Sequence, residues 1–331
     1  MTFKFPKNKP LLLDGATGTE LEKHGVSLND KLWSGIAVIS EPEKLEEVYL
    51  DYLNCGSELL ETATYQLTKK GLIEHDLDPH STYQKAIDIA DSARQKYFKK
   101  TGKKALIVGS IGPFGAYLAD GAEFTGHYPE ISNKEMKAFH SDRLDYLYNS
   151  PLVDIIGFET IPSFEEVKSI LEMMKVKLDE AKKNGTPYKP YYLALSCSPE
   201  MVLADGSLLH KVLEYIDGHL EENLIAVGAN CCGLRTSKVL IEKFDLEFGN
   251  FHNLDKQCKI VIYPNSGEIY DGITKEWIMD DKLGTTDLQQ AFKEASEIFL
   301  SKKRLGLVGG CCRTGPAQIK LLRKMIDEKA D

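Results

Sequence analysis

The sequence predicts a single (β/α)8 TIM barrel with elongated βα loops, occupying residues 1–331 as one domain. Three observations lead to this prediction. Short apolar runs recur along the chain, and each is followed by a longer amphipathic stretch. The runs are rich in Val, Ile and Leu without polar alternation, which is typical of parallel strands buried on both faces. They number eight, which favours a closed barrel. A doubly wound sheet ranks second, because it generally has fewer strands and no GxGxxG motif follows the first run.

The eight apolar runs define the expected strands. In chain order they are Leu11–Ala16, Glu58–Tyr65, Ala105–Gly112, Val153–Thr160, Tyr191–Ser198, Leu224–Cys231, Lys259–Gly267 and Arg304–Cys312. The segments between them predict helices, because apolar residues recur at spacings of three and four, as in residues 82–98 and 164–183. Ser163, with carboxylates in the turn that follows it, predicts the start of the second of these helices.

Three of the connections that follow predicted strands are unusually long. They are Gln66–His80, Phe114–Ser132 and Glu268–Thr285. In a (β/α)8 barrel such loops build the face that carries the chemistry. Phe114–Ser132 is rich in Gly and aromatic residues, so we interpret it as a lid, with an ordinary mobile surface loop as the alternative.

Composition and charge exclude several classes of protein. The chain is 42% hydrophobic and 27% charged, an ordinary balance for a soluble globular protein. The net charge is −9 without a basic stripe, so nucleic acid is not an expected partner. No signal peptide or membrane-spanning run is visible, so no membrane partner and a cytoplasmic location are expected. The seven cysteines are odd in number and therefore read as reduced thiols in a cytosol.

The predicted strand ends carry thiols, carboxylates and small hydroxyls. The carboxyl ends of the strands hold the active site in this fold. None of the eight histidines and no lysine falls at such an end, which disfavours a histidine-ligated hydrolase and a Schiff-base aldolase. The polar and thiol residues at these ends are Asp14, Glu61, Thr62, Thr64, Ser110, Glu159, Thr160, Ser196, Cys197, Asn230, Cys231, Cys232, Asn265, Ser266, Cys311 and Cys312.

Three of these thiols form a candidate metal site. Predicted strands six and eight are two apart around a barrel, so Cys231 and the Cys311–Cys312 pair could bind one tetrahedral zinc with an open fourth position. Gly309–Gly310 would let the backbone turn so that both neighbouring thiols face inward. A helix starting near Pro316 would favour thiolate over thiol. The alternative is that Cys231 and Cys311 are buried small apolar residues. We assign that simpler role to the other four, Cys55, Cys197, Cys232 and Cys258.

A site with three thiolates favours one kind of reaction. Three thiolates on a dication leave a net negative centre, which is a poor Lewis acid but can hold a fourth sulfur as an electron-rich thiolate. The expected reaction is attack of a substrate thiol on an alkyl group. The protein would then mainly align nucleophile and electrophile.

Six motifs together resemble the homocysteine S-methyltransferase family. They are LLLDGATGTELEKHG, ETATYQ, GFETIPSFEE, VGANCCG, YPNSGE and GGCCRTGP, and they run in order from Leu11 to about Pro316. The resemblance implies a (β/α)8 barrel that transfers a methyl group from a sulfonium donor to L-homocysteine and forms methionine. It also implies one Zn2+ per chain on Cys231, Cys311 and Cys312.

The resemblance further assigns substrate contacts. Asp14, Gly15 and Glu159 match positions that hold the amino-acid part of homocysteine, and a carboxylate facing an ammonium is sensible chemistry there. For the two carboxylates the alternative is a helix cap or a rim salt bridge. Trp33 aligns with an aromatic residue that faces the methyl donor, a cation–π contact. Its alternative is a core tryptophan.

The methyl donor is predicted from departures within the resemblance. Thr160 and Gln66 stand where the betaine-using relatives have tyrosines, so an aromatic cage for a trimethylammonium group is depleted. This favours S-methylmethionine first and S-adenosylmethionine second over betaine. Weaker candidates for lining the donor pocket are Thr62, Thr64, Gln66, Asn265 and Ser266.

Two other functions remain open from the sequence. One is a metal-independent lyase or hydrolase that uses the carboxylates of Asp14 and Glu159. The other is a non-catalytic thiol or metal store, against which the expected lid argues. A monomer or weak homodimer is expected, because the chain lacks the C-terminal extension through which the betaine-using relatives form tetramers.

Overall fold

The protein is a barrel of eight parallel strands, seen in a computed structural model that describes residues 3–126, 128, 131–271, 276–283 and 285–330. The sheet order is β1-β10-β7-β6-β5-β4-β3-β2. The strands are β1 (Leu11–Leu12), β2 (Leu59–Glu61), β3 (Leu106–Ile111), β4 (Ile155–Ile161), β5 (Tyr191–Leu195), β6 (Leu224–Asn230), β7 (Lys259–Tyr263) and β10 (Leu305–Val308). Between β1 and β2, Glu58 N–H donates to Leu12 O at 2.8 Å and brings the ring close to closure. The predicted (β/α)8 barrel is confirmed, and the doubly wound alternative is wrong.

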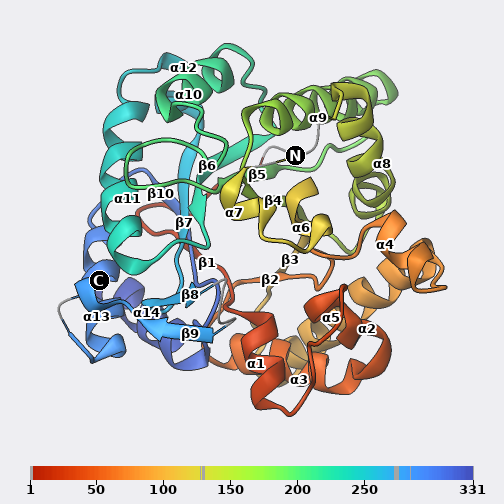
Figure 1. Cartoon of the computed structure of the whole chain (residues 1–331), viewed down its shortest axis with the longest axis horizontal. Helices are drawn as coiled ribbons and strands as arrows, with labels where there is room; N and C mark the ends of the chain where they lie inside the picture. Colours follow the sequence, from red (N-terminus) through yellow and green to blue (C-terminus); the bar gives the residue numbers. More distant parts are fainter. Residues whose placement is uncertain (1–2, 127, 129–130, 272–275, 284, 331) are drawn as a thin grey trace.

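Helices surround this ring of strands, as Figure 1 shows. They are α1 (Thr17–Lys23), α2 (Ala37–Ser40), α3 (Pro42–Asn54), α4 (Lys69–Glu74), α5 (Pro79–Thr101), α6 (Phe114–Leu118), α7 (Ala122–Thr125), α8 (Asn133–Asn149), α9 (Phe164–Asn184), α10 (Leu209–Gly218), α11 (Leu234–Phe248), α12 (His252–Gln257), α13 (Leu288–Leu300) and α14 (Pro316–Ala330), with 3-10 turns η1 (Trp33–Ile36) and η2 (Asp281–Leu283). Ser163 caps α9 by accepting from Glu166 N at 3.2 Å, as predicted.

Two hydrophobic layers hold the barrel together. One lies between the strands and the helices, and the other fills the interior of the ring. The interior layer includes Tyr192 and Val261, with Phe3 and Phe5 packed against it. Glycine is needed in the strands beside it, because a Cβ on Gly157 would lie 2.5 Å from the Tyr192 hydroxyl. Since the interior is packed, a substrate site is confined to the mouth at the carboxyl ends of the strands.

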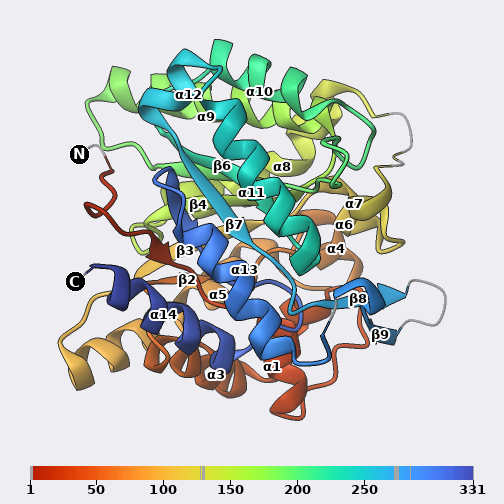
Figure 2. The same cartoon turned by 90° about the vertical axis from the view of Figure 1, so that its left-hand side faces the viewer.

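The long loops lie together at that mouth. Figure 2 shows both termini at one end of the barrel, and α6, α7 and the hairpin of β8 (Glu268–Asp271) and β9 (Glu276–Met279) at the other. The loop predicted after strand two contains α4, and the expected lid contains α6 and α7. Residues 127, 129–130, 272–275 and 284 of the predicted loops lie outside the described residues.

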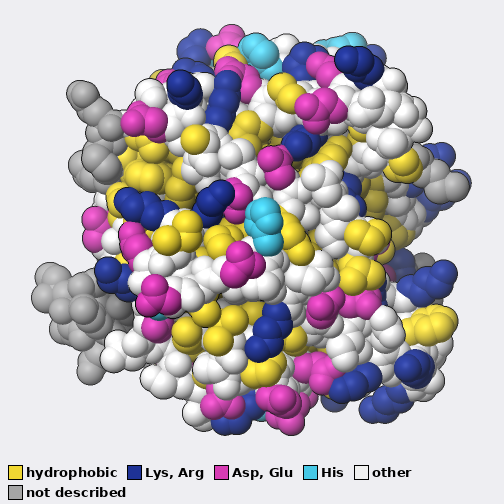
Figure 3. Space-filling model, turned by 90° about the vertical axis from the view of Figure 1, so that its right-hand side faces the viewer, with side chains coloured by type: hydrophobic (Ala, Val, Ile, Leu, Met, Phe, Trp, Pro, Cys, Tyr) yellow, Lys and Arg dark blue, Asp and Glu magenta, His cyan; other side chains and the backbone are white. Residues whose placement is uncertain are grey.

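Several strands are shorter than the apolar runs that predict them. β1 covers two residues of the run Leu11–Ala16, and β7 ends at Tyr263 although its run extends to Gly267. The residues beyond each strand leave the sheet and form the mouth. On the face of the molecule in Figure 3, acidic and basic side chains are intermixed. Within the described ranges, no helix has both the length and the apolar character to cross a membrane.

Candidate active site

Three cysteine thiols meet at the carboxyl ends of β6 and β10. Cys231 follows β6 directly, and Cys311 and Cys312 follow β10 after two glycines. Their sulfurs all lie within 4.8 Å of one another, and Cys231 Sγ is 3.5 Å from Cys312 Sγ. All three residues are only partly buried, so the cluster is open to a further ligand. An all-sulfur set of three with an accessible side fits the preferences of a zinc ion with one open position.

The backbone turns at the thiols through two non-glycine residues. Cys231 has φ 52° and Arg313 has φ 66°, both in the left-handed region. Such conformations cost about 1–3 kcal/mol and are typical of functional sites. Gly309–Gly310 do not have positive φ. The prediction that these glycines provide the turn is therefore wrong.

Close packing between the first and last strands explains the glycines instead. A Cβ on Gly309 would lie 2.6 Å from Leu13 Cβ, and one on Gly310 would lie 2.0 Å from Thr314 Cγ2. Gly15 is similarly confined, because its Cβ would lie 2.4 Å from Thr314 O. These contacts exclude any side chain at the three positions. They bring the segment after β1 directly against the thiols that follow β10.

The three thiols shift one another's pKa values. Hydrogen bonds from Cys231 and Cys311 lower the pKa of the Cys312 thiol well below its usual range. The same hydrogen bonds, together with burial, raise the pKa of Cys231. The neighbouring sulfurs are thus the main cause that favours a thiolate at Cys312. The helix predicted after the thiols is α14, which begins at Pro316. The remaining four thiols are free and packed in or against the apolar layer.

Asn230 connects the thiols to β4. Its Oδ1 accepts from Thr160 N at 2.8 Å and its Nδ2 donates to Thr160 Oγ1 at 2.9 Å. The same Nδ2 lies 4.0 Å from Cys311 Sγ. Thr160 itself has φ 57°, so this pair of hydrogen bonds holds a strained residue in place. Asn230 is 2% exposed and positions one of the sulfurs.

Three carboxylates lie in the same mouth. Asp14 Oδ2 accepts from Glu61 N at 3.0 Å, while its Oδ1 is buried and has no hydrogen-bond partner. Glu61 Oε1 accepts from the Tyr192 hydroxyl at 2.6 Å. Glu159 accepts from the Ser110 hydroxyl. Gly310 N donates to Asp14 O at 3.1 Å, which joins the carboxylates to the thiol segment.

The surroundings of the three carboxylates disfavour their charged forms. Burial raises the pKa of Asp14 well above its usual value, and the nearby Glu159 raises it further. Burial and then Glu159 raise the pKa of Glu61 in the same way. For Glu159, burial raises the pKa to about 7. Such a site favours cationic ligands, because a bound cation stabilises the negatively charged form of the carboxylates.

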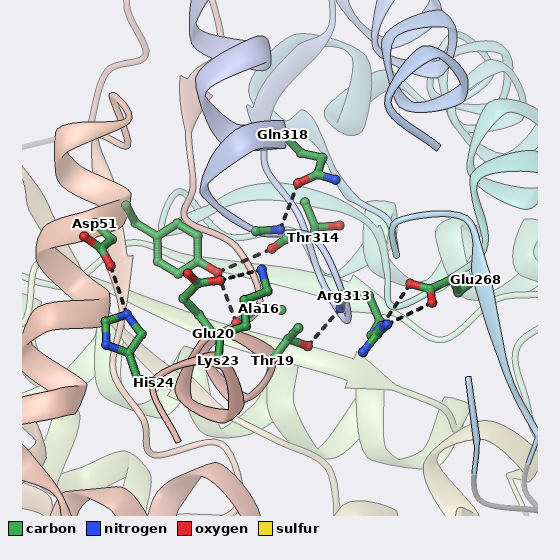
Figure 4. A network of polar contacts seen from close by, with 12 residues as sticks. Ala16, Thr19, Glu20, Lys23, His24, Asp51, Glu268, Arg313, Thr314 and Gln318 are labelled. Atoms are coloured by element: carbon green, nitrogen blue, oxygen red, sulfur yellow. Dashed lines mark hydrogen bonds and ion pairs between the residues drawn. The ribbon is translucent and has the colours of Figure 1, made fainter. Parts of the chain in front are cut away.

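A network at the rim fixes the segment that follows Cys312 (Figure 4). The Tyr52 hydroxyl donates to Ala16 O at 3.0 Å and lies 3.4 Å from Thr314 O. Arg313 forms a bidentate pair with Glu268 of β8, with both distances 2.9 Å. The pair ties the hairpin to the thiol segment and lowers the pKa of Glu268.

The weaker pocket candidates that follow β2 form hydrogen bonds to other parts of the protein. Thr62 Oγ1 and Thr64 Oγ1 are 2.6 Å apart, and Thr64 Oγ1 donates to Ser110 O at 2.7 Å. Together they support the serine that binds Glu159. Gln66 donates to Ala116 O of α6 and so attaches the lid to the end of β2.

The other weaker candidates lie beside the thiol backbone or at the rim. Asn265 N donates to Cys232 O at 2.9 Å, and Asn265 Oδ1 is buried without a partner. Ser266 N donates to Cys312 O at 3.1 Å, and its side chain lines a rim cavity of about 400 Å³. Trp33 is 37% exposed with φ 45°, and its ring packs on Gly18, so it is not a core tryptophan.

Sequence reasoning missed several contributors to the site. Tyr192 lies inside β5, where an aromatic residue reads as core, although its hydroxyl binds Glu61. Arg143 of α8 is 1% exposed and donates to Thr64 O, Tyr65 O and Gly112 O. No motif marks a helix arginine for this role. Its burial lowers its own pKa to about 10.

The geometry agrees with the family suggested by the six motifs. The family model described as homocysteine S-methyltransferase matches residues 11–326. The chain belongs to the homocysteine S-methyltransferase family. The prediction made from the motifs is thereby confirmed, and the metal-independent lyase or hydrolase loses its support.

Individual members of the homocysteine S-methyltransferase family show the same extent of similarity. Homocysteine S-methyltransferase 1 of Arabidopsis thaliana is 34% identical over 95% of this chain and 92% of its own length. Homocysteine S-methyltransferase of Escherichia coli is 32% identical over 96% and 95%. The metallated form of the E. coli homocysteine methyltransferase MmuM superimposes with a TM-score of 0.79 at 30% identity, covering 96% of this chain and 97% of that chain. Metal use therefore occurs within the family.

Proposed function

We propose that the chain transfers a methyl group from a sulfonium donor, S-methylmethionine first and S-adenosylmethionine second, to L-homocysteine, and so forms methionine. Zinc would be held by Cys231, Cys311 and Cys312. The observation that carries the proposal is the meeting of three thiols and three carboxylates at one barrel mouth, where the Asp14 and Glu159 carboxylates are buried.

The carboxylates suit the amino-acid part of homocysteine. Asp14 presents a buried oxygen without a partner, and Glu159 is buried beside it, so an α-ammonium group would supply the missing positive charge. Gly15 would allow close approach to the backbone. Held there, homocysteine would direct its sulfur toward the thiol cluster.

The metal would supply one chemical property. Zinc on the three cysteines would keep the homocysteine thiol deprotonated at neutral pH. The side chains of this protein then align the sulfur with the methyl group and exclude water under α6 and α7.

The sulfonium donor is supported by the residues around the mouth. The Gln66 amide is engaged with Ala116, and Thr160 is engaged with Asn230, so neither position offers an aromatic face to a trimethylammonium group. Trp33 at the rim remains the proposed cation–π contact for the donor. Thr62, Thr64, Asn265 and Ser266 are proposed to shape the pocket from behind.

The test is methionine formation from L-homocysteine in a reducing buffer with zinc. S-methylmethionine, S-adenosylmethionine and betaine are supplied separately at equal concentration, and Cys312→Ser serves as the metal-site variant. We expect product from the sulfonium donors, fastest from S-methylmethionine, and neither product nor stoichiometric zinc with Cys312→Ser. Product from betaine alone would contradict the donor assignment, and full activity of Cys312→Ser would contradict the metal site.

A further inference from the structure

One carboxylate at the mouth has no role in the site described so far. Glu123 lies in the short helix α7, within the lid, and α6 and α7 lie over the centre of the ring of strands in Figure 1. Its Oε2 is buried and has no hydrogen-bond partner. In the part of the chain that the structure describes, no ion pair involves this residue. A buried carboxylate oxygen without a partner is costly unless a ligand satisfies it.

The Glu123 carboxylate is electrostatically coupled to the segment that follows β2. After burial, its negative charge is the main cause that raises the pKa of Tyr65, which follows β2. Glu123 is nevertheless not one of the residues whose ligand atoms lie within 4.8 Å of one another in the thiol cluster. The carboxylate therefore belongs to the lid above the mouth and carries a buried, unpartnered oxygen there, without belonging to the candidate metal ligands.

The lid is built to hold this side chain in place. Ala122 N donates to Asp120 Oδ1 at 3.0 Å at the start of α7. Gly115 of α6 packs so closely on α7 that its Cβ would lie 2.6 Å from Glu123 N. Gln66 fastens α6 to the end of β2. Because these contacts fix α6 and α7 relative to each other and to the end of β2, the position of Glu123 is set by the fold.

We propose that Glu123 is the counter-charge for the sulfonium of the methyl donor and selects cationic donors. The inference rests on the proposed function. A sulfonium carries a permanent positive charge that it cannot lose by deprotonation, and a desolvated carboxylate attracts it much more strongly than water would. The partner of the unpaired oxygen is then the donor itself.

The chemistry determines how this contact affects the reaction. During transfer, the bond between the sulfonium sulfur and the methyl carbon breaks and its electron pair stays on the donor sulfur. A lone pair of the homocysteine thiolate forms the new bond to the methyl carbon. Both products are neutral thioethers, so the attraction to Glu123 fades along the reaction and is strongest in the ground state. Glu123 therefore lowers the donor KM and assists release of the neutral product, but does not raise kcat.

Steady-state kinetics of the zinc-loaded enzyme with Glu123→Gln, Glu123→Asp and Glu180→Gln test this role. Glu180→Gln removes the same charge from an exposed site on α9, where the side chain is 59% exposed. We expect Glu123→Gln to raise the KM for the sulfonium donor about tenfold or more, which is ~1.4 kcal/mol. The homocysteine KM and the inhibition constant of methionine should stay near those of the wild type, and kcat should not fall. Glu123→Asp should lie between, and Glu180→Gln should match the wild type.

Two results would overturn the inference. One is an unchanged donor KM in Glu123→Gln with zinc content and melting temperature equal to the wild type. The other is a parallel loss of kcat and homocysteine affinity in both Glu123 variants, which would mean that the residue only supports the fold. Failure of the proposed function looks different, because the wild type itself would then form no methionine from any sulfonium.

Discussion

Replacement of Asn230 by alanine should weaken both the fold and the metal site. The side chain makes two buried hydrogen bonds to Thr160, each worth about 1 kcal/mol. Its loss also leaves Thr160 N buried without a partner, and removes the support of a left-handed residue. Together these effects predict a loss of roughly 2–4 kcal/mol in the free energy of unfolding. For a chain of this size that corresponds to a fall of roughly 3–6 °C in Tm.

The metal affinity should fall as well, because Asn230 Nδ2 lies beside Cys311 Sγ. Loss of such a supporting contact typically costs about 10- to 100-fold in affinity. Calorimetry of the metal-free protein and zinc competition against a chromophoric chelator measure the two effects separately. Asn230→Asp is the matched control, since it keeps the acceptor for Thr160 N but places a negative charge near the sulfur. It should lose less stability than Asn230→Ala but at least as much zinc affinity. An Asn230→Ala protein with unchanged Tm and unchanged zinc affinity would refute the reasoning.

Three further predictions concern the same mouth. Gly310→Ala should destabilise the protein by several °C in a thermal melt and reduce bound zinc, because its Cβ would lie 2.0 Å from Thr314 Cγ2; a wild-type melt would contradict this. Burial raises the pKa of Glu159 to about 7 from 4.5, so its neutral form is favoured in the fold. The metal-free, substrate-free protein should then lose stability as pH rises from about 4.5 to 7, by on the order of 3 kcal/mol. In urea titrations across this range Glu159→Gln should show a flatter dependence, and an identical slope would count against the assignment. Asp14→Asn should raise the homocysteine KM about tenfold or more while the donor KM stays the same, and equal changes in both constants in initial-rate assays would argue against a role specific to homocysteine.

The order of strands and helices could be predicted from the sequence, because strands that are buried on both faces appear as continuous apolar runs. All eight apolar runs became barrel strands, and the thiols predicted from the ends of strands six and eight do meet. The ends of the strands were less predictable. Asp14 belongs to an apolar run by pattern, yet the chain leaves the sheet before it, since a buried carboxylate needs partners that only the folded mouth provides.

Contacts between distant segments account for what the sequence could not show. The turn at the thiols depends on left-handed residues at Cys231 and Arg313, which no local rule for glycine would select. Arg143 and Tyr192 act through hydrogen bonds to segments 31 to 131 residues away, so their sequence neighbourhood gives no sign of them. Single-domain organisation and the specific residues proposed for substrate contact stay predictions.

The joining of the first and last strands has a consequence for biosynthesis. Asp14 and Gly310 are hydrogen-bonded at 3.1 Å although nearly the whole chain separates them. A ribosome must therefore release the chain beyond Cys312 before the thiol that follows β6 can meet the two that follow β10. Closing so long a loop is entropically slow, and native contacts of this kind delay folding. A chain that stops before Cys311 therefore lacks two of the three thiols of the proposed metal site, so tight binding of the ion would require that β6 and β10 have both been made and have come together.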